Sequence, residues 1–182
     1  MHNNIPKSDN YFDPHLGIDF GGVIIPMVKK KRGGDTQFSD NFLHTPPQYN
    51  ALVRIQSLVK AFNGKVWIVS KAGKRIEYLT RIWMAANNFF SYTGIPEENL
   101  FFCRERIEKR PLCKRLRVTH FIDDRIHIMQ ILKGIVPYLF LFGDKEQNRS
   151  ARKWTVLVED WNEAYDAVLT SIEDFKSKYK TG

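Results

Sequence analysis

The chain of 182 residues has little cysteine, no long apolar run and no internal repeat. Its two cysteines, Cys103 and Cys113, are not spaced like the ligands of a zinc site or like a secreted disulfide framework, so we expect reduced thiols in a cytoplasmic protein. No window reaches the roughly 20 apolar residues of a membrane span, and the polar N-terminal residues lack the apolar core of a signal peptide. These absences favour a soluble protein over a secreted or membrane one.

Acidic residues are scarce relative to basic ones. The chain has 20 Asp and Glu against 28 Lys and Arg, a net charge of +8, and the excess is concentrated at residues 29–32 and 104–117. This charge favours contact with phosphates, nucleic acid or an acidic partner without choosing among them. The 43% hydrophobic and 26% charged residues are typical of a folded protein, and the length fits one domain.

Short apolar runs alternate with amphipathic stretches along the chain. Residues 1–14 are expected to form a loose lead-in, residues 26–45 a long basic loop, and residues 89–95 a turn. The hydrophobic pattern predicts strands over 16–20, 65–69, 100–103, 118–122, 138–142 and 155–158, and helices over 47–62, 73–88, 111–116, 126–133 and 160–179. This alternation predicts a single α/β domain, a three-layer Rossmann-like sandwich with a mainly parallel sheet.

Polar side chains follow three of the predicted strands. Asp19 ends the first, Ser70 and Lys71 end the second, and Asp123 and Asp124 end the fourth. Each position alone is also what a turn or a helix cap would contain. In a parallel sheet, however, the carboxyl ends of strands share one edge, where ligands bind near the point at which strand order reverses. Carboxylates gathered there would suit magnesium, and the serine hydroxyl and lysine would suit a phosphate.

Four segments resemble, in order, the motifs of the haloacid dehalogenase (HAD) superfamily of hydrolases. Gly17-Ile18-Asp19-Phe20-Gly21-Gly22-Val23-Ile24 resembles the first, Trp67-Ile68-Val69-Ser70 the second, and His120-Phe121-Ile122-Asp123-Asp124-Arg125 the fourth. Lys109 is similar in placement to the third-motif lysine, with Lys114 as the alternative.

The resemblance implies a chemistry as well as a fold. It makes Asp19 a nucleophile that forms an aspartyl-phosphate, with Ser70 and Lys109 holding the phosphoryl oxygens. It implies a magnesium ion held by Asp19, the Gly21 carbonyl, Asp123 and Asp124.

The sequence departs from the phosphatases of this superfamily at one position. Two residues after the nucleophile they typically carry a second aspartate, which acts as general acid and base, and here that position is Gly21. A general acid contributes roughly 100-fold to 10,000-fold in rate. His15, His44 and Lys71 are candidate substitutes.

Members of the superfamily often carry a cap domain inserted after the first motif or between the second and third motifs. Both of these segments are too short here for a full cap domain, so we expect a capless protein with an open site. The leading interpretation is a magnesium-dependent phosphohydrolase acting on a phosphorylated substrate. An open site could admit a large substrate, and the basic patches would suit one that resembles nucleic acid. The alternative is a catalytically silent HAD-like module that binds an anionic partner such as nucleic acid.

Overall fold

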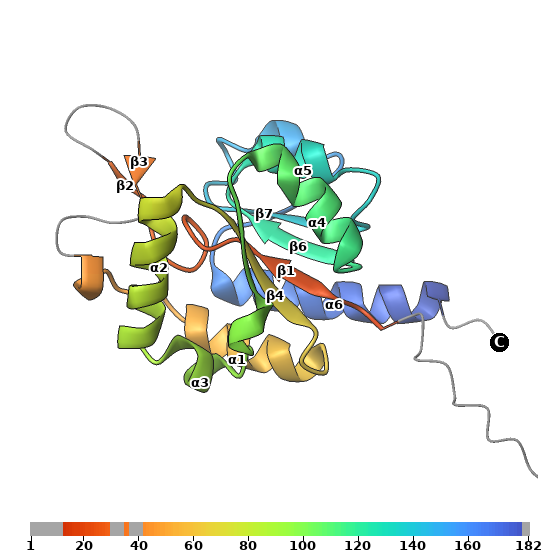
Figure 1. The fold of residues 1–182 in the computed structure, drawn as a ribbon. Helices are drawn as coiled ribbons and strands as arrows, with labels where there is room; N and C mark the ends of the chain where they lie inside the picture. Colours follow the sequence, from red (N-terminus) through yellow and green to blue (C-terminus); the bar gives the residue numbers. More distant parts are fainter. Residues whose placement is uncertain (1–12, 30–34, 37–41, 180–182) are drawn as a thin grey trace, which may run out of the picture.

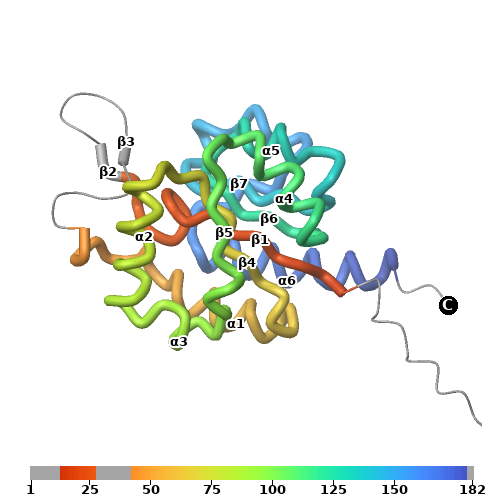
Figure 2. Tube along the Cα trace, viewed as in Figure 1, coloured from red at the N-terminus to blue at the C-terminus, as the bar shows by residue number. Residues whose placement is uncertain are grey.

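Six parallel strands form the centre of the molecule (Figures 1 and 2). The computed structural model describes residues 13–29, 35–36 and 42–179. The strand order is β5-β4-β1-β6-β7-β8, and all five pairings are parallel. The strands are β1 (Leu16–Ile18), β4 (Val66–Lys71), β5 (Leu100–Cys103), β6 (His120–Asp123), β7 (Tyr138–Phe142) and β8 (Val156–Val158). The predicted parallel sheet is therefore confirmed.

Helices cover both faces of this sheet, which makes the fold a three-layer α/β sandwich (Figure 1). One face carries α1 (Ala51–Ala61), α2 (Lys74–Ala86), α3 (Phe89–Thr93) and α6 (Trp161–Tyr179), and the other carries α4 (Lys109–Arg115) and α5 (Ile126–Leu132). Each face has its own apolar cluster, because the strand side chains alternate between the two faces. The described residues also form short 3-10 helices, namely η1 (Phe42–His44), η2 (Glu97–Asn99), η3 (Arg106–Glu108) and η4 (Arg149–Ala151).

Two buried tryptophans hold the segment that follows β1. The indole N–H of Trp161 donates to the Val23 carbonyl, and that of Trp83 donates to the Thr45 carbonyl, each at 2.8 Å. Both rings are completely buried, so each N–H would be an unpaired donor without these bonds. Side chains of α2 and α6 thereby fix the backbone near the two ends of the long connection between β1 and α1.

Two sequence predictions were wrong in detail. Residues 89–93 form the short helix α3 rather than a turn, because Phe89 is buried and Thr93 Oγ1 donates back to the Phe89 carbonyl within one helical turn. The stretch expected as a long basic loop over 26–45 contains a short two-stranded antiparallel ribbon of β2 (Val28–Lys29) and β3 (Asp35–Thr36). Most of the predicted lead-in and the residues 30–32 of the first basic patch lie outside the described residues. Among the helices described, none has the length and apolar character needed to cross a bilayer.

Candidate active site

The order of the strands reverses at β1. The chain proceeds from β1 outwards to β4 and β5 on one side, then returns to the other side of β1 to build β6, β7 and β8. In such sheets a crevice forms beyond the carboxyl ends of the strands at the reversal. Asp19 comes directly after β1 at this point, and its backbone N–H donates to the Ile122 carbonyl of β6 at 2.9 Å.

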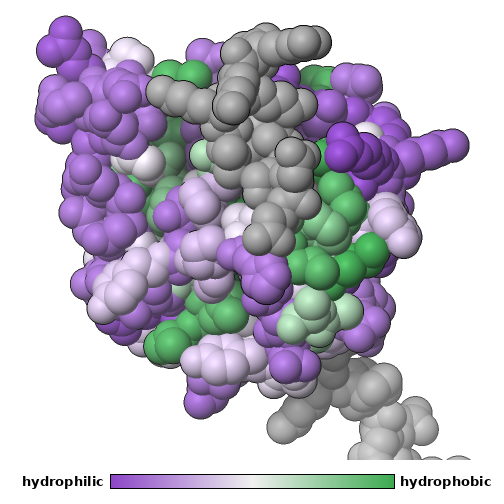
Figure 3. Space-filling view, turned by 90° about the vertical axis from the view of Figure 1, so that its left-hand side faces the viewer, coloured by the Kyte–Doolittle hydropathy of each residue, from purple (hydrophilic) through white to green (hydrophobic). Residues whose placement is uncertain are grey.

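A crevice of about 240 Å³ lies at this edge of the sheet. We call it the crevice from here on; its wall consists of Asp19, Gly21, Met27, Lys71, Ala72, Gly73, Ile76, Arg106, Lys109, Asp123, Asp124, Arg125 and Ile128. Figure 3 views the molecule from the left-hand side of Figure 1, the side towards which β1 runs. Hydrophilic residues cover most of the periphery of that face, and hydrophobic residues gather in separate areas between them.

The glycine pair after Asp19 lets the fourth-motif aspartate approach the first motif. Gly22 has φ of +83°, a left-handed conformation that a residue with a Cβ rarely adopts. A Cβ at Gly22 would lie 2.2 Å from Asp124 Oδ2, which is a severe steric clash. Glycine at position 22 is therefore required both by the turn and by the side chain packed against it.

Lys109 is the centre of the charged groups in the crevice. Its side chain is 1% exposed, and its Nζ lies 2.7 Å from Asp123 Oδ2 and 3.1 Å from Asp19 Oδ1. Burial lowers the pKa of Lys109, but the charges of Asp123 and Asp19 outweigh burial and raise the pKa above its usual value. Lys109 is therefore a permanent cation, placed between the carboxylates of two different strands.

The carboxylates themselves are held close to one another. One oxygen from each of Asp19, Asp123 and Asp124 lies within 4.8 Å of the others. Burial, followed by the charges of Asp19 and Asp123, raises the pKa of Asp124 to about 7. Burial and the charge of Asp19 also raise the pKa of Asp123, although Lys109 opposes this. The site thus contains more negative charge than Lys109 alone neutralises.

This donor set fits a hard divalent cation. Its donors are carboxylate oxygens, the ligands that magnesium prefers. Asp19 Oδ1 is buried and has no hydrogen bond of good geometry, since its contact with Lys109 Nζ is an ion pair without the alignment of a hydrogen bond. A buried carboxylate oxygen in that state calls for a further positive partner. Gly21, whose carbonyl is the further ligand expected from the sequence, also lies in the wall of the crevice.

Ser70 and Lys71 occupy the carboxyl end of β4, next to β1. Ser70 is 1% exposed and lies one residue before the crevice wall, whereas Lys71 is exposed and forms part of that wall. The structure thus brings Lys71 to the crevice and Ser70 beside it, as their places at a strand end predict.

Other predicted residues are not brought to the crevice. Lys114 is exposed on α4 and is not part of the crevice wall, so the geometry favours Lys109 over Lys114. His15 lies at the amino end of β1, where its Nδ1 is 2.8 Å from the Leu116 carbonyl. His44 is exposed in η1 and is not in the wall either. Of the three candidate substitutes for the missing acid, only Lys71 lines the crevice.

Two charged residues of the crevice wall were not among the site residues predicted from sequence. Arg106 belongs to η3, three residues before Lys109, and Arg125 follows Asp124 directly. Arg106 lies within a basic run and Arg125 within the fourth motif, so the only available sequence signal was positive charge next to motif residues. Charge alone does not reveal which side chains of a basic run face the crevice.

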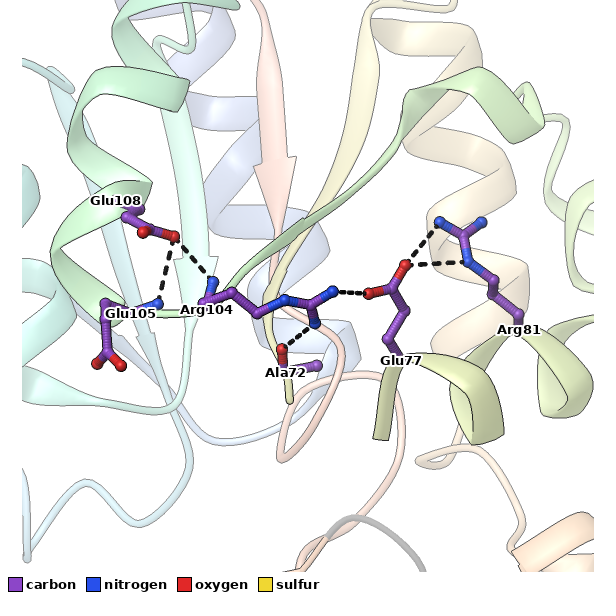
Figure 4. Close-up of polar contacts among 6 residues, drawn as sticks. All are labelled: Ala72, Glu77, Arg81, Arg104, Glu105 and Glu108. Carbon is purple, nitrogen blue, oxygen red and sulfur yellow. Dashed lines mark hydrogen bonds and ion pairs between the residues drawn. The ribbon is translucent and has the colours of Figure 1, made fainter. Parts of the chain in front are cut away.

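An ion network connects the two elements that bear Lys71 and Lys109 (Figure 4). The Arg104 guanidinium donates to the Ala72 carbonyl at 2.7 Å and to Glu77 Oε2, and the other oxygen of Glu77 accepts from Arg81. The backbone N–H of Arg104 donates in turn to Glu108 Oε2 at 2.8 Å.

Glu108 immediately precedes Lys109, and its carboxylate takes part in the capping box of η3. Arg104 therefore ties the β4–α2 loop to the turn that presents Lys109. One cation of the basic stretch 104–117 is thus engaged within the protein.

A second hollow lies beside the crevice and shares Met27 and Asp124 with it. Its wall is rich in carboxylate and amide groups, namely Gln48, Asp124, Asp144, Gln147, Asn148 and Glu159. The Asp144 carboxylate accepts hydrogen bonds from the backbone N–H groups of Glu146 and Gln147, which keeps its pKa below the usual value. The β7–β8 side of the site is thus acidic, whereas Lys71, Arg106 and Arg125 line the crevice itself.

No protein-family model and no curated protein matches the sequence. Solved structures, however, share its fold. A D,D-heptose 1,7-bisphosphate phosphatase from B. bronchiseptica, complexed with magnesium and phosphate, matches with a TM-score of 0.57 and 14% identity over 87% of this chain and 99% of that chain. The cobalt-bound deoxy-D-mannose-octulosonate 8-phosphate phosphatase from Haemophilus influenzae matches with a TM-score of 0.53 and 16% identity over 92% and 91% of the two chains. The chain therefore has the HAD-like α/β fold of these two phosphatases.

Proposed function

We propose that the protein is a magnesium-dependent phosphomonoester phosphatase without a full cap domain. The observation that carries this proposal is the buried Lys109 ammonium between Asp19 and Asp123, at the reversal of strand order. A nucleophilic carboxylate, a fixed cation and a cluster of metal-binding oxygens are the groups that phosphoryl transfer requires. The two phosphatases that share the fold, one of them complexed with magnesium and phosphate, support the same assignment.

Magnesium would be held by Asp19, Asp123 and the Gly21 carbonyl, with Asp124 directly or through water. When bound, the ion neutralises negative charge on the transferring phosphoryl group and on the carboxylates around it. The Lys109 ammonium group lies against Asp19 and Asp123 and favours the charged carboxylate of each, the form that metal binding and nucleophilic attack need.

Asp19 is the nucleophile in this proposal. A carboxylate oxygen of Asp19 bonds to phosphorus while the bond from phosphorus to the leaving oxygen breaks, which gives an aspartyl-phosphate and an alcohol. Water then attacks phosphorus, restores the Asp19 carboxylate and releases inorganic phosphate. Lys109 and Ser70 hold the phosphoryl oxygens, and Lys71 adds a positive charge at the mouth of the crevice.

Position 21 determines which substrates are hydrolysed quickly. With glycine there, the leaving oxygen takes its proton from water or from the Lys71 ammonium group, since Lys71 alone among the three candidate substitutes lines the crevice. Esters with acidic leaving groups need little proton transfer, so they are expected to react faster than alkyl phosphates. A plot of rate against leaving-group pKa measures this dependence.

The decisive experiment replaces the nucleophile. Asp19→Asn should reduce magnesium-dependent release of phosphate from p-nitrophenyl phosphate, sugar phosphates, nucleotides and phosphorylated oligonucleotide ends by at least about 1,000-fold. Asp166→Asn makes the same chemical change at an exposed position on α6 and should leave turnover unchanged. Circular dichroism checks that both variants fold. Unchanged turnover in Asp19→Asn would contradict the assignment.

Gly21 and the exposed cations favour one further candidate function, a catalytically silent module that binds an anionic partner such as nucleic acid. Not all of the basic stretch 104–117 is available for this, since Arg104 is engaged with Glu77 and Arg110 donates to the Ile131 carbonyl at the end of α5. If several phosphates are neutralised on binding, affinity for oligonucleotides falls steeply with salt. A flat salt dependence, together with magnesium-dependent turnover, would exclude this candidate.

A further inference from the structure

Two arginines in the crevice wall carry charges that the carboxylates leave largely uncompensated. Arg106 is exposed and has no ion pair with any residue in the described ranges. Arg125 makes one ion-pair contact, from its Nε to Asp124 Oδ2, at 3.6 Å, which is too long for a hydrogen bond. Both guanidinium groups therefore retain donors for a ligand.

These two charges act on the same region of the site. Arg106 belongs to η3 and Arg125 precedes α5, and both residues line the crevice. The pKa of His127 is lowered by burial and then by the charges of Arg106, Arg125 and Lys109, so all three cations act on one imidazole. His127 Nε2 is buried and has no hydrogen-bond partner among the described residues.

The charge balance of the crevice points in the same direction. Four cationic side chains and three carboxylates line it, and Lys109 is already paired with two of the carboxylates. A bound divalent ion adds two further positive charges, and the dianion of one phosphate ester only cancels those two. One positive side-chain charge is therefore left over; among the described residues Arg106 has no ion pair, and Arg125 has only its 3.6 Å contact with Asp124.

We propose that Arg106 and Arg125 form a second anion subsite, which binds a phosphate or carboxylate group of the substrate other than the phosphoryl group that is transferred. This inference rests on the proposed function and narrows its substrate class to small phosphomonoesters that carry a second anionic group. Guanidinium groups suit this role, because they form two parallel hydrogen bonds with either oxyanion and stay charged at every physiological pH.

The test compares matched esters. Monophosphates of α,ω-diols of increasing chain length are assayed beside the corresponding bisphosphates and beside phosphates of ω-hydroxy acids, which end in a carboxylate. At the best chain length the wild type should prefer a doubly anionic ester by about 10-fold or more in kcat/KM, the ratio that 1.4 kcal/mol provides. Comparison of the bisphosphates with the carboxylates shows which oxyanion the subsite takes.

Arg106→Gln should abolish most of this preference through a higher KM for the doubly anionic ester, while its activity on the monophosphates stays within about twofold. Lys60→Gln removes the same charge from the last turn of α1, which leads to the amino end of β4 at the opposite edge of the sheet, and should change nothing. In the double variant that combines Arg106→Gln with Arg125→Gln, the monophosphates and the doubly anionic esters should react at equal rates. Equal rates in the wild type at every chain length, or a preference that persists in the double variant, would overturn the inference.

Failure of the proposed function is recognised separately. If the wild type hydrolyses none of these esters, the phosphatase assignment fails, and calorimetric titration with the same compounds in magnesium then decides the subsite. Tighter binding of the bisphosphate than of the monophosphate, lost in Arg106→Gln, supports the subsite. Equal affinity of the two compounds for the wild type refutes it.

Discussion

Removal of the Lys109 charge should cost much more stability than removal of an exposed lysine. Lys109→Met keeps most of the apolar stem, since methionine is similarly long and unbranched, but it leaves Asp123 and Asp19 without their cation. Loss of one partner from a buried ion pair destabilises a protein by about 3–5 kcal/mol, because the remaining charge stays buried without compensation. We expect a decrease of this size in the free energy of unfolding of the metal-free protein near neutral pH.

Lys65→Met provides the matched control. Lys65 Nζ pairs with Asp13 Oδ2 at 2.6 Å, a distance as short as those at Lys109, but both side chains are about one third exposed, at 36% and 35%. A solvent-exposed pair contributes about 0–1 kcal/mol, so this variant should unfold at nearly the wild-type urea concentration. Urea unfolding in the presence of a chelator measures both variants. Equal destabilisation by the two substitutions would refute the argument that burial, rather than pairing itself, sets the magnitude.

Magnesium and protons should both rescue the Lys109→Met protein. Under the proposed function, magnesium binds the folded carboxylate cluster and stabilises it by mass action. Without the Lys109 charge the cluster is more negative and should bind the ion more tightly, so the deficit relative to wild type should shrink when magnesium is present.

The pKa of Asp124 is already raised to about 7 in the wild type, by burial and by Asp19 and Asp123. A folded-state pKa above the unfolded value means that the folded protein binds the proton more tightly. Lys109 opposes this rise, so its removal should raise the pKa of Asp124 further and let the variant gain more stability on acidification than the wild type gains. The deficit should therefore also shrink as the pH falls from about 8 to about 5. A deficit that grows on acidification would contradict this assignment.

Three further predictions concern acid stability, the ion network and the missing acid. Burial lowers the pKa of His120 to about 3, so below about pH 6.5 the unfolded chain binds a proton that the folded protein does not, and stability falls as the pH drops. His120→Phe should reduce the loss of stability between about pH 8 and pH 5 by about 2 kcal/mol, measured by urea unfolding at both pH values. An unchanged pH dependence in this variant would count against the assignment. Arg104→Gln should lower kcat about 10-fold or more with little effect on thermal stability, because an exposed ion pair stabilises little. The guanidinium group holds the Ala72 loop against residue 104, whose backbone N–H bonds to Glu108 next to Lys109, so the substitution releases the loop from this turn. Arg104→Lys, which restores one charged donor, should rescue kcat in part, and a large fall in melting temperature with normal kcat would show a merely structural role. Gly21→Asp should raise kcat for alkyl phosphates by about 10-fold or more and leave kcat for p-nitrophenyl phosphate nearly unchanged, because only poor leaving groups need a general acid. If kcat changes equally for both esters, the missing acid does not limit the rate.

Periodicity in the sequence was enough to predict most of the secondary structure. The apolar runs at β1, β6 and β7 are buried on both faces, and a strand of that kind has a recognisable pattern. The pattern was insufficient at α3, where a short aromatic segment forms a helix because of its tertiary packing against α1 and α2.

The sequence by itself determined that Asp19, Ser70 and Asp123 end strands, because the apolar runs before them are local features of the chain. Only the tertiary structure decided which lysine joins them. Lys109 and Lys114 belong to the same short helix, but five residues turn a helix by about 140°, so one side chain is buried against the sheet while the other is exposed to solvent. The same holds for Arg106 and Arg125, which are 19 positions apart in the printed sequence and meet at one crevice because η3 and α5 belong to neighbouring parts of the fold. Strand order, which no local pattern encodes, places these cations opposite the carboxylates.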